Sequence, residues 1–231
     1  SHPLRKKGCL TVRGMPGFAT SMKDRVCLIT GASGGLGKAC ALELARLGSE
    51  VVIVGRNQVR IDSALESIRT QTGNERVNGL LGDLSIQADV RRVAGQFCQK
   101  YDRLDVLINN VGGAFFSYQA TPDGVERVWA LNYLNHFLLT NSLLDLLKTT
   151  AKVHGEARII ELTSLIYGWA SSNFTRRQGP RWFNGVLAYA QSKRAAVVYT
   201  CELARQLQNT GVTANVISPG LVSTNVARHE S

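Results

Sequence analysis

The feature that most constrains the fold of this chain is a regular alternation of short apolar runs with longer segments of helical spacing. The apolar runs are residues 25–30, 50–54, 77–83, 104–109, 157–163 and 212–217. Several are apolar throughout, which is typical of strands buried on both faces of a parallel sheet. The segments predicted as helices are 36–47, 60–70, 88–101, 124–148 and 186–208.

This alternation predicts an α/β fold in which helices cover both faces of one parallel sheet. Because crossover connections are right-handed, the sheet is expected to be doubly wound, in a three-layer α/β/α arrangement of the Rossmann type. A chain of 231 residues with 44% hydrophobic and 19% charged residues has the size and composition of one globular domain.

The beginning of the chain differs in composition from the rest. Residues 1–23 hold five basic residues and no acidic one, which is half of the net charge of +10. We interpret 1–23 as a flexible basic leader and 24–231 as the folded domain. The leader is open to three explanations: a native segment, a remnant of a targeting segment, or part of an expression tag.

The sequence also excludes some classes of protein. No apolar run reaches the roughly 20 residues that span a bilayer, so we expect a soluble chain without a transmembrane segment. The cysteines lack CxxC spacing, which indicates reduced thiols and a cytoplasmic location, with organelle targeting by the basic leader as the alternative. The histidines lack ligand spacing, so no metal is expected. The cysteines are Cys9, Cys27, Cys40, Cys98 and Cys201.

A glycine-rich loop joins the first predicted strand to the first helix. It runs from Thr30 to Gly37 as TGASGGLG. Glycines allow a tight turn and a close approach of the backbone to a pyrophosphate, and the helix that follows offers unpaired N–H groups. The loop is not a P-loop, because Lys38 is followed by Ala39 instead of serine or threonine. In this position it predicts a dinucleotide site.

The end of the second predicted strand discriminates between the two dinucleotides. An NAD site usually has a carboxylate there, which bonds the ribose hydroxyls. This chain has Gly55, followed by Arg56 and Asn57. Arg56 can pair with a 2′-phosphate and Ser33 can donate to it, so NADP(H) is favoured. The alternative for Arg56 is an exposed loop arginine.

Two further strand ends point to the same edge of the sheet. Asp83 and Leu84 follow the third strand, where Asp83 is a candidate to accept from the adenine amino group. Capping of the next helix is the alternative role for Asp83. The segment from Asn109 to Gly112 ends the fourth strand at the same carboxyl edge, where ligands bind in such sheets.

The candidate chemistry lies on the last predicted helix and the strand before it. Tyr189 and Lys193 are four residues apart and so face the same way. An ammonium beside a phenol favours the phenolate, so we expect the pKa of Tyr189 to be lowered and Tyr189 to act as a general acid and base. Ser164 ends the fifth strand and is expected to hold the substrate oxygen.

With these motifs the chain resembles the short-chain dehydrogenase/reductase family over about residues 24–224. The family motif TGxxxGxG is matched from Thr30 to Gly37, NNAG from Asn109 to Gly112 with valine at 111, and PGxxxT from Pro219 to Thr224. The resemblance implies four catalytic residues, Asn132, Ser164, Tyr189 and Lys193. The expected cofactor contacts are Gly31, Ser33, Gly35, Leu36, Gly37, Arg56, Asn57, Asp83, Leu84, Asn110, Val111, Gly112, Thr163, Tyr189, Lys193, Pro219, Gly220, Val222 and Thr224.

The resemblance also implies a mechanism. Tyr189 protonates a carbonyl oxygen or takes a hydroxyl proton, while Lys193 lowers its pKa and bonds the nicotinamide ribose. Ser164 orients the substrate, the Asn132 carbonyl holds a water for proton relay, and Thr224 bonds the carboxamide. Hydride passes between cofactor and substrate, so the protein supplies placement and electrostatics.

The long stretch between Ser164 and Tyr189 resembles the insertion of the retinol dehydrogenase-like branch. Its aromatic residues are candidates for an apolar substrate pocket or for packing within a lid, and its arginines are candidates to bind an anionic substrate or to form a solvated face. We expect an apolar aldehyde, ketone or alcohol of retinoid, steroid or lipid type. The aromatic residues are Trp169, Phe174, Trp182 and Phe183, and the arginines are Arg176, Arg177 and Arg181.

The sequence ends soon after PGxxxT. In the family this region continues into a segment that covers the substrate and a strand that supports a dimer. We therefore expect the covering segment to be absent, while a homodimer is one possible state of this chain.

Light-dependent protochlorophyllide reductases are similar over the same motifs. A non-catalytic NADP(H)-binding sensor or scaffold is the alternative outside enzymes. The basic charge alone would also suit nucleic acid, but no basic stripe with aromatics supports that, so no nucleic-acid partner is expected.

Overall fold

The computed structural model describes residues 21–171, 174 and 180–220. Its centre is a six-stranded sheet in which all neighbouring strands are parallel, in the order β3-β2-β1-β4-β5-β6. The strands are β1 (Val26–Thr30), β2 (Glu50–Gly55), β3 (Val77–Leu81), β4 (Val106–Asn109), β5 (Ala157–Leu162) and β6 (Val212–Ile217). All six predicted strands are therefore confirmed.

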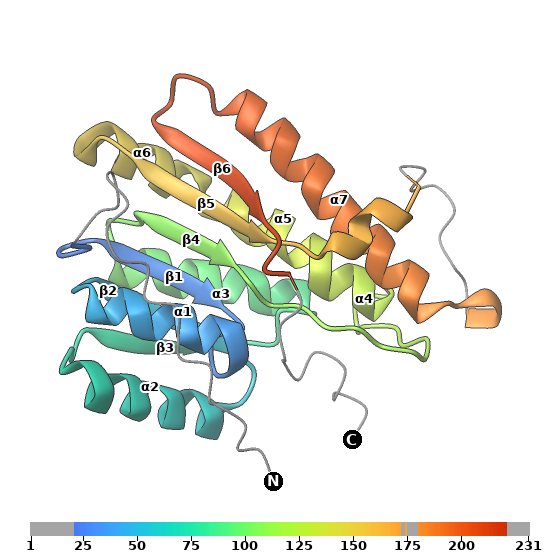
Figure 1. The fold of residues 1–231 in the computed structure, drawn as a ribbon, viewed down its shortest axis with the longest axis horizontal. Helices are drawn as coiled ribbons and strands as arrows, with labels where there is room; N and C mark the ends of the chain where they lie inside the picture. Colours follow the sequence, from blue (N-terminus) through green and yellow to red (C-terminus); the bar gives the residue numbers. More distant parts are fainter. Residues whose placement is uncertain (1–20, 172–173, 175–179, 221–231) are drawn as a thin grey trace, which may run out of the picture.

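Helices cover both faces of the sheet (Figure 1). One apolar core joins α1 and α2 to one face, and a second core joins α3, α5, α6 and α7 to the other. The helices are α1 (Gly35–Arg46), α2 (Gln58–Thr72), α3 (Gln87–Lys100), α4 (Arg127–Trp129), α5 (Asn135–Ser142), α6 (Leu144–His154) and α7 (Gly185–Gln206). The predicted doubly wound, single-domain α/β fold of the Rossmann type is confirmed.

The predicted long helix 124–148 is wrong as a single element. It consists of α4, a π-helical segment η1 (Ala130–Leu134), α5 and α6, and α6 continues to His154. Polar side chains interrupt it near Leu143, because Ser142 Oγ donates to the Leu138 carbonyl and Asn141 Nδ2 to the Phe137 carbonyl. Such bonds compete with the regular helix ladder.

The order of the strands places a crevice at the carboxyl edge of the sheet. The chain winds outward from β1 to β2 and β3, then crosses back to β4 and continues to β5 and β6. The loops after β1 and β4 therefore leave in opposite directions, and ligands of open α/β sheets bind at this switch point. The predicted glycine loop follows β1 directly.

Candidate active site

A cleft of about 940 Å³ lies at this switch point. Its walls come from the loops after all six strands, from the first turns of α1 and α2, and from the second and third turns of α7. It brings together every described residue predicted as a cofactor contact, together with Ser164. Asn132 is not among its lining residues and lies behind the wall, with no exposed surface.

The glycine loop takes its shape from close backbone packing. Gly31 has φ +66°, and a Cβ there would lie 2.9 Å from Val111 Cα. Such a contact and such a φ both favour glycine. Gly34 is the N-cap of α1 and provides no side-chain cap, so the first N–H groups of α1 remain available at the cleft.

Asn110 fixes the loop in place instead of pointing freely into the cleft. Its Nδ2 donates to the Thr30 carbonyl at 2.7 Å and to the Gly31 carbonyl at 3.2 Å. The backbone N–H groups of Asn110 and Val111 both donate to Thr30 Oγ1 at 3.0 Å. The end of β4 is thereby tied to the loop after β1, so Asn110 acts on any ligand mainly through this loop.

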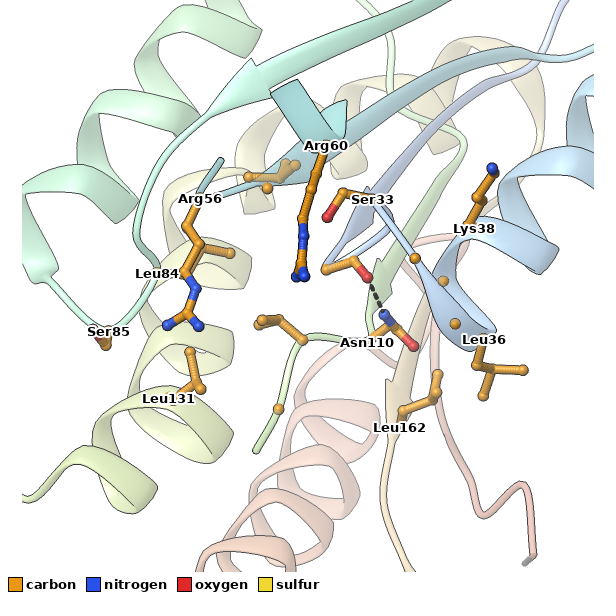
Figure 2. A pocket seen from close by; sticks show the side chains of 18 of the residues that line it. Ser33, Leu36, Lys38, Arg56, Arg60, Leu84, Ser85, Asn110, Leu131 and Leu162 are labelled. Carbon is orange, nitrogen blue, oxygen red and sulfur yellow. Dashed lines mark hydrogen bonds between the residues drawn. The ribbon is translucent and has the colours of Figure 1, made fainter. Parts of the chain in front are cut away.

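Two arginines stand at the end of β2 (Figure 2). Arg56 and Arg60 extend their guanidinium groups in the same direction in Figure 2, where Arg60 lies between Arg56 and Ser33, and all three residues line the cleft. Gly55 leaves this corner open, because a Cβ there would lie 3.3 Å from Ser33 Oγ. Asn57 caps α2, since its Oδ1 accepts from the Arg60 N–H at 3.0 Å. The predicted contact at Asn57 therefore has a structural role as well.

Arg60 lines the cleft but was not among the cofactor contacts predicted from the sequence, although its spacing from Arg56 could have indicated it. It lies four residues after Arg56, in the first turn of α2. Residues spaced by four around a helix start share a face. The spacing could have suggested that Arg56 and Arg60 form a pair of cations. It did not show that Arg56, which precedes α2, would face the cleft together with Arg60.

Asp83 and Leu84 line the cleft below β3, but the side chain of Asp83 is partly engaged. Its Oδ1 accepts from the N–H of Ser85 at 2.9 Å and from Ser85 Oγ at 2.7 Å. The helix α3 starts later, with Ile86 as its N-cap, so the alternative that Asp83 caps this helix is wrong. Asp123 instead accepts from the N–H of Gln87 at 2.8 Å.

The predicted chemical groups meet on the other side of the cleft. Tyr189 and Lys193 lie on α7, and Ser164 follows β5, where its side chain partly offsets the rise in the pKa of Tyr189 that burial causes. Lys193 is 4% exposed, and its Nζ donates to the Leu162 carbonyl at 2.9 Å. A Cβ on Gly112 would lie 3.4 Å from that Nζ, so the ammonium sits at the floor of the cleft.

The expected lowering of the Tyr189 pKa is wrong for the chain alone. Burial raises the pKa of Tyr189, and the hydrogen bond from Ser164 only partly opposes this. Burial also lowers the pKa of Lys193, while the charge of Glu161 raises it. Desolvation disfavours the charged form of both groups, which a spacing of four residues on a helix does not reveal.

Asn132 lies in the π-helical segment, where turns are wider than in an α-helix. Its Oδ1 accepts from the Gly113 N–H at 2.8 Å, and its Nδ2 donates to the Gly113 carbonyl at 2.9 Å and to Ser192 Oγ at 3.2 Å. Ser192 in turn donates to the Tyr189 carbonyl at 2.8 Å. The side chain of Asn132 thus links the loop after β4 to the start of α7.

Some of the remaining predicted cofactor contacts are described by the structure, and others lie outside the described residues. Thr163, Pro219 and Gly220 line the cleft. Val222 and Thr224 lie outside the described residues, as do the leader up to residue 20 and two insertion arginines, Arg176 and Arg177.

The aromatic residues of the insertion do not line the cleft. Trp169 and Trp182 are 80% and 83% exposed. Phe174 packs near Trp129, and Phe183 packs edge-on against Tyr118. The apolar residues of the wall include Phe115, Leu131 and Leu162.

Two further properties concern the described residues only. Within 21–171, 174 and 180–220, no group of three or more His, Cys, Asp or Glu residues is placed to hold a metal ion. Over the same ranges, none of the helices combines the length and the apolar character needed to cross a membrane.

A doubly wound sheet with a glycine loop at its switch point defines a Rossmann-type domain. The model of the short chain dehydrogenase family matches residues 25–231. The chain therefore belongs to the short-chain dehydrogenase family, and the resemblance drawn from its motifs is confirmed.

The curated relatives agree with the retinol dehydrogenase-like branch. Retinol dehydrogenase 14 of Mus musculus is 40% identical over 226 residues, covering 94% of this chain and 66% of the relative. Polyprenol dehydrogenase of Homo sapiens is 40% identical over 208 residues, covering 89% and 63%. The chain thus spans just under two thirds of the length of these relatives.

Solved structures show the same fold. The Pseudomonas aeruginosa RhlG/NADP active-site complex matches with a TM-score of 0.74 at 29% identity, covering 91% of this chain and 77% of that one. A short-chain dehydrogenase from Sphingobium yanoikuyae in complex with NADPH matches with a TM-score of 0.71 at 26% identity, covering 87% and 73%.

Proposed function

We propose that this chain is the catalytic domain, residues 24–231, of an NADP(H)-dependent oxidoreductase that interconverts an alcohol and a carbonyl compound. One observation carries the proposal. Tyr189 and Ser164 share a cleft with the buried Lys193 and with the glycine loop at the N-terminus of α1. A proton-transfer group and a phosphate-binding loop in one cleft are what such a reaction requires.

The residues present fit a dinucleotide. The close packing of Gly31 on Val111 keeps the backbone clear of side chains where a pyrophosphate would approach α1. Gly112 leaves the Lys193 ammonium open to the cleft floor, where it would bond a ribose. When bound, a nicotinamide cofactor supplies or accepts the hydride.

The chain itself moves the proton. In reduction the Tyr189 hydroxyl gives its proton to the carbonyl oxygen, and in oxidation the Tyr189 phenolate takes the proton of the alcohol. Ser164 donates a hydrogen bond that holds the substrate oxygen beside Tyr189. The positive charge of Lys193 stabilises the phenolate, and Asn132 keeps the start of α7 in register with the loop after β4.

The preference for NADP(H) rests on the corner at the end of β2. Arg56, Arg60 and Ser33 offer two cations and a hydroxyl there, and Gly55 offers no carboxylate. A guanidinium pairs with a phosphate in bidentate geometry, whereas a carboxylate would repel it. The NADP and NADPH complexes among the similar structures support the same choice.

An apolar substrate is supported by the wall and by the relatives. Phe115 and Leu131 form part of the cleft, and relatives carry the names retinol dehydrogenase and polyprenol dehydrogenase. Both names describe alcohols on long apolar chains. We therefore propose a primary or secondary alcohol of retinoid, steroid or lipid type, or the corresponding aldehyde or ketone.

The proposal is tested with Tyr189→Phe, which removes one oxygen from the cleft. We expect turnover of a retinoid or prenyl aldehyde with NADPH to fall by at least about 100-fold, because general acid–base groups contribute that much. Binding of NADPH, followed by fluorescence titration, should change less than about threefold. Tyr101→Phe is the matched control, since Tyr101 lies at the far end of α3, where its hydroxyl accepts from Asn78 at 3.0 Å.

Unchanged turnover in Tyr189→Phe would refute the acid–base role. Tight NADPH binding without reduction of any aldehyde or ketone in a broad panel would instead favour a sensor or scaffold on the same fold.

A further inference from the structure

A buried acid and a buried histidine meet behind the cleft. His136 lies on α5 and Glu161 on β5, and each side chain is 1% exposed. His136 Nδ1 is 2.5 Å from Glu161 Oε1, and His136 Nε2 is 2.9 Å from the Val111 carbonyl oxygen. Neither side chain takes part in the proposed proton transfer, yet His136 contacts the loop after β4, which forms part of the cleft wall.

The two hydrogen-bond partners of the His136 imidazole limit which protonation states satisfy both of its ring nitrogens. Both are oxygen acceptors: one belongs to a carboxyl group and the other to a backbone carbonyl. A neutral imidazole has one N–H, so it would leave one ring nitrogen facing an acceptor lone pair. The arrangement is satisfied by an imidazolium beside a carboxylate, or by a neutral imidazole beside a protonated Glu161.

Lys193 distinguishes these two states. Its Nζ donates to the carbonyl of Leu162, the residue after Glu161, and the two charges interact across this short stretch of β5. Glu161 Oε2 is buried and has no hydrogen-bond partner among the described residues. Lys193 and Glu161 form no ion pair within 4.0 Å, so their charges act on each other at longer range, where the charge of Glu161 raises the pKa of Lys193.

Two hydrogen-bonded connections reach the cleft floor from β5. Glu161 bonds His136, and His136 bonds the Val111 carbonyl. Lys193 Nζ donates to the Leu162 carbonyl, and a Cβ added to Gly112, the residue after Val111, would lie 3.4 Å from that Nζ. The loop after β4, the strand β5 and the helices α5 and α7 thus meet around Lys193.

We propose that Glu161 is the buried counter-ion of Lys193, and that His136, as an imidazolium, holds Glu161 and the Val111 carbonyl in place. Both are positioning residues, since they act on the reaction through Lys193 and through the loop at Val111. The role of Glu161 and His136 in catalysis rests on the proposed function and deepens it. Its structural claim, that Glu161 keeps Lys193 charged, is measurable without any turnover.

The other groups around the pair do not take over this role. Opposite Glu161 in the sheet, β4 contributes Asn109 and β6 contributes Val216, which carry no charge. On α7, burial and then the charge of Glu161 raise the pKa of Tyr199, so it remains an uncharged phenol. The pKa of Tyr189 is raised as well, so this phenol too is uncharged in the cofactor-free chain.

The test is the pH dependence of Lys193 labelling. Acetic anhydride reacts with uncharged amines, and peptide mass spectrometry reports the fraction of Lys193 acetylated at each pH. Removal of a nearby opposite charge lowers the pKa of a lysine, so Glu161→Gln should move the labelling curve down by about one pH unit. Glu202→Gln is the matched control, because Glu202 lies on α7 like Lys193 and its carboxylate is exposed and paired with Arg205. It should leave the curve unchanged.

Two further measurements complete the design. Glu161→Asp keeps the charge, and its labelling curve should lie closer to that of the unaltered chain than to that of Glu161→Gln. In the unaltered chain labelled with ¹⁵N-histidine, nitrogen NMR at pH 7 should show both ring nitrogens of His136 protonated, and this needs no variant to fold.

An unshifted labelling curve in a folded Glu161→Gln chain would overturn the proposal, and so would a deprotonated ring nitrogen on His136. Neither readout depends on NADPH or on a substrate. Failure of the enzyme assay with Tyr189→Phe therefore remains distinguishable from failure of this inference.

Discussion

At the scale of single residues, Asp105 is a polar junction on the edge of the sheet opposite the cleft. Its carboxylate accepts from Arg25 at 2.9 Å, from Arg103 at 2.6 Å and from the N–H of Val26 at 2.8 Å. Burial alone would raise the pKa of Asp105, but these hydrogen bonds hold it below its usual value. The junction joins the start of β1 to the start of β4.

We expect Asp105→Asn to lower the free energy of unfolding at pH 7 by about 2 kcal/mol, because two arginines lose their buried acceptor. A carboxyl whose pKa is lowered on folding stabilises the fold above its unfolded pKa, and this contribution is lost as the pH falls through the folded pKa. The difference between the two chains should therefore shrink below about pH 4. Urea unfolding at several pH values measures this.

Glu43→Gln serves as the control for this variant. It removes an exposed acid that is paired with Arg46 on α1. Exposed pairs contribute little, so its effect should stay below about 1 kcal/mol. A pH-independent difference for Asp105→Asn would contradict the role given to the carboxylate charge.

The arginine pair at the end of β2 also acts residue by residue. Arg56→Ala and Arg60→Ala should each weaken NADPH binding by at least about tenfold, while NADH binding changes less than about threefold, because only NADPH carries the 2′-phosphate. Isothermal titration with both dinucleotides measures this. Arg91→Ala on α3 is the control, since Arg91 does not line the cleft. Equal losses for both dinucleotides would mean that the phosphate is bound elsewhere.

At the scale of elements, the position of Tyr189 depends on how α7 begins. Asn184 caps the helix by accepting from the Leu187 N–H at 3.0 Å. Gly185 is the first helical residue, and a Cβ there would lie 2.2 Å from the Phe115 carbonyl oxygen. The start of α7 therefore rests directly on the backbone of the loop after β4, one turn before Tyr189.

We expect Gly185→Ala to displace the start of α7, to lower the thermal midpoint, and to reduce kcat by at least about tenfold, because small displacements of reacting groups are costly. Gly95→Ala on α3 is the matched control. A Cβ at Gly95 meets nothing within 4 Å, so this variant should raise stability by up to about 1 kcal/mol through helix propensity and leave kcat unchanged. Equal behaviour of the two variants would contradict the packing argument.

Elements were predictable where one local pattern decides them. The strands follow from continuous apolar runs such as that of β1, and the glycine loop follows from its place after that strand. The break at Leu143 was not predictable, because helical apolar spacing continues across it. What ends α5 is a set of side-chain bonds to the backbone, which spacing does not encode.

At the scale of the whole molecule, the topology brings the predicted site together, but long-range contacts determine what the residues do there. Tyr189, Lys193 and Ser164 meet because β5 and α7 are neighbours. That Asn110 serves as a clamp and that burial governs the pKa of Lys193 both depend on segments far away in the chain. The same holds for the pairing of His136 with Glu161, which joins residues 25 positions apart.

The clamp at Asn110 has a consequence for the order in which the molecule is made. Four hydrogen bonds join Thr30 and Gly31 to Asn110 and Val111, and the partners are about 80 positions apart. On the ribosome, at roughly 5–20 residues per second, the first strand and its glycines emerge several seconds before the residues that hold them. The glycine loop of the nascent chain thus acquires its final shape only when the fourth strand arrives. Until then, β1, β2 and β3 lack the neighbouring strand that completes the cleft at the end of β1.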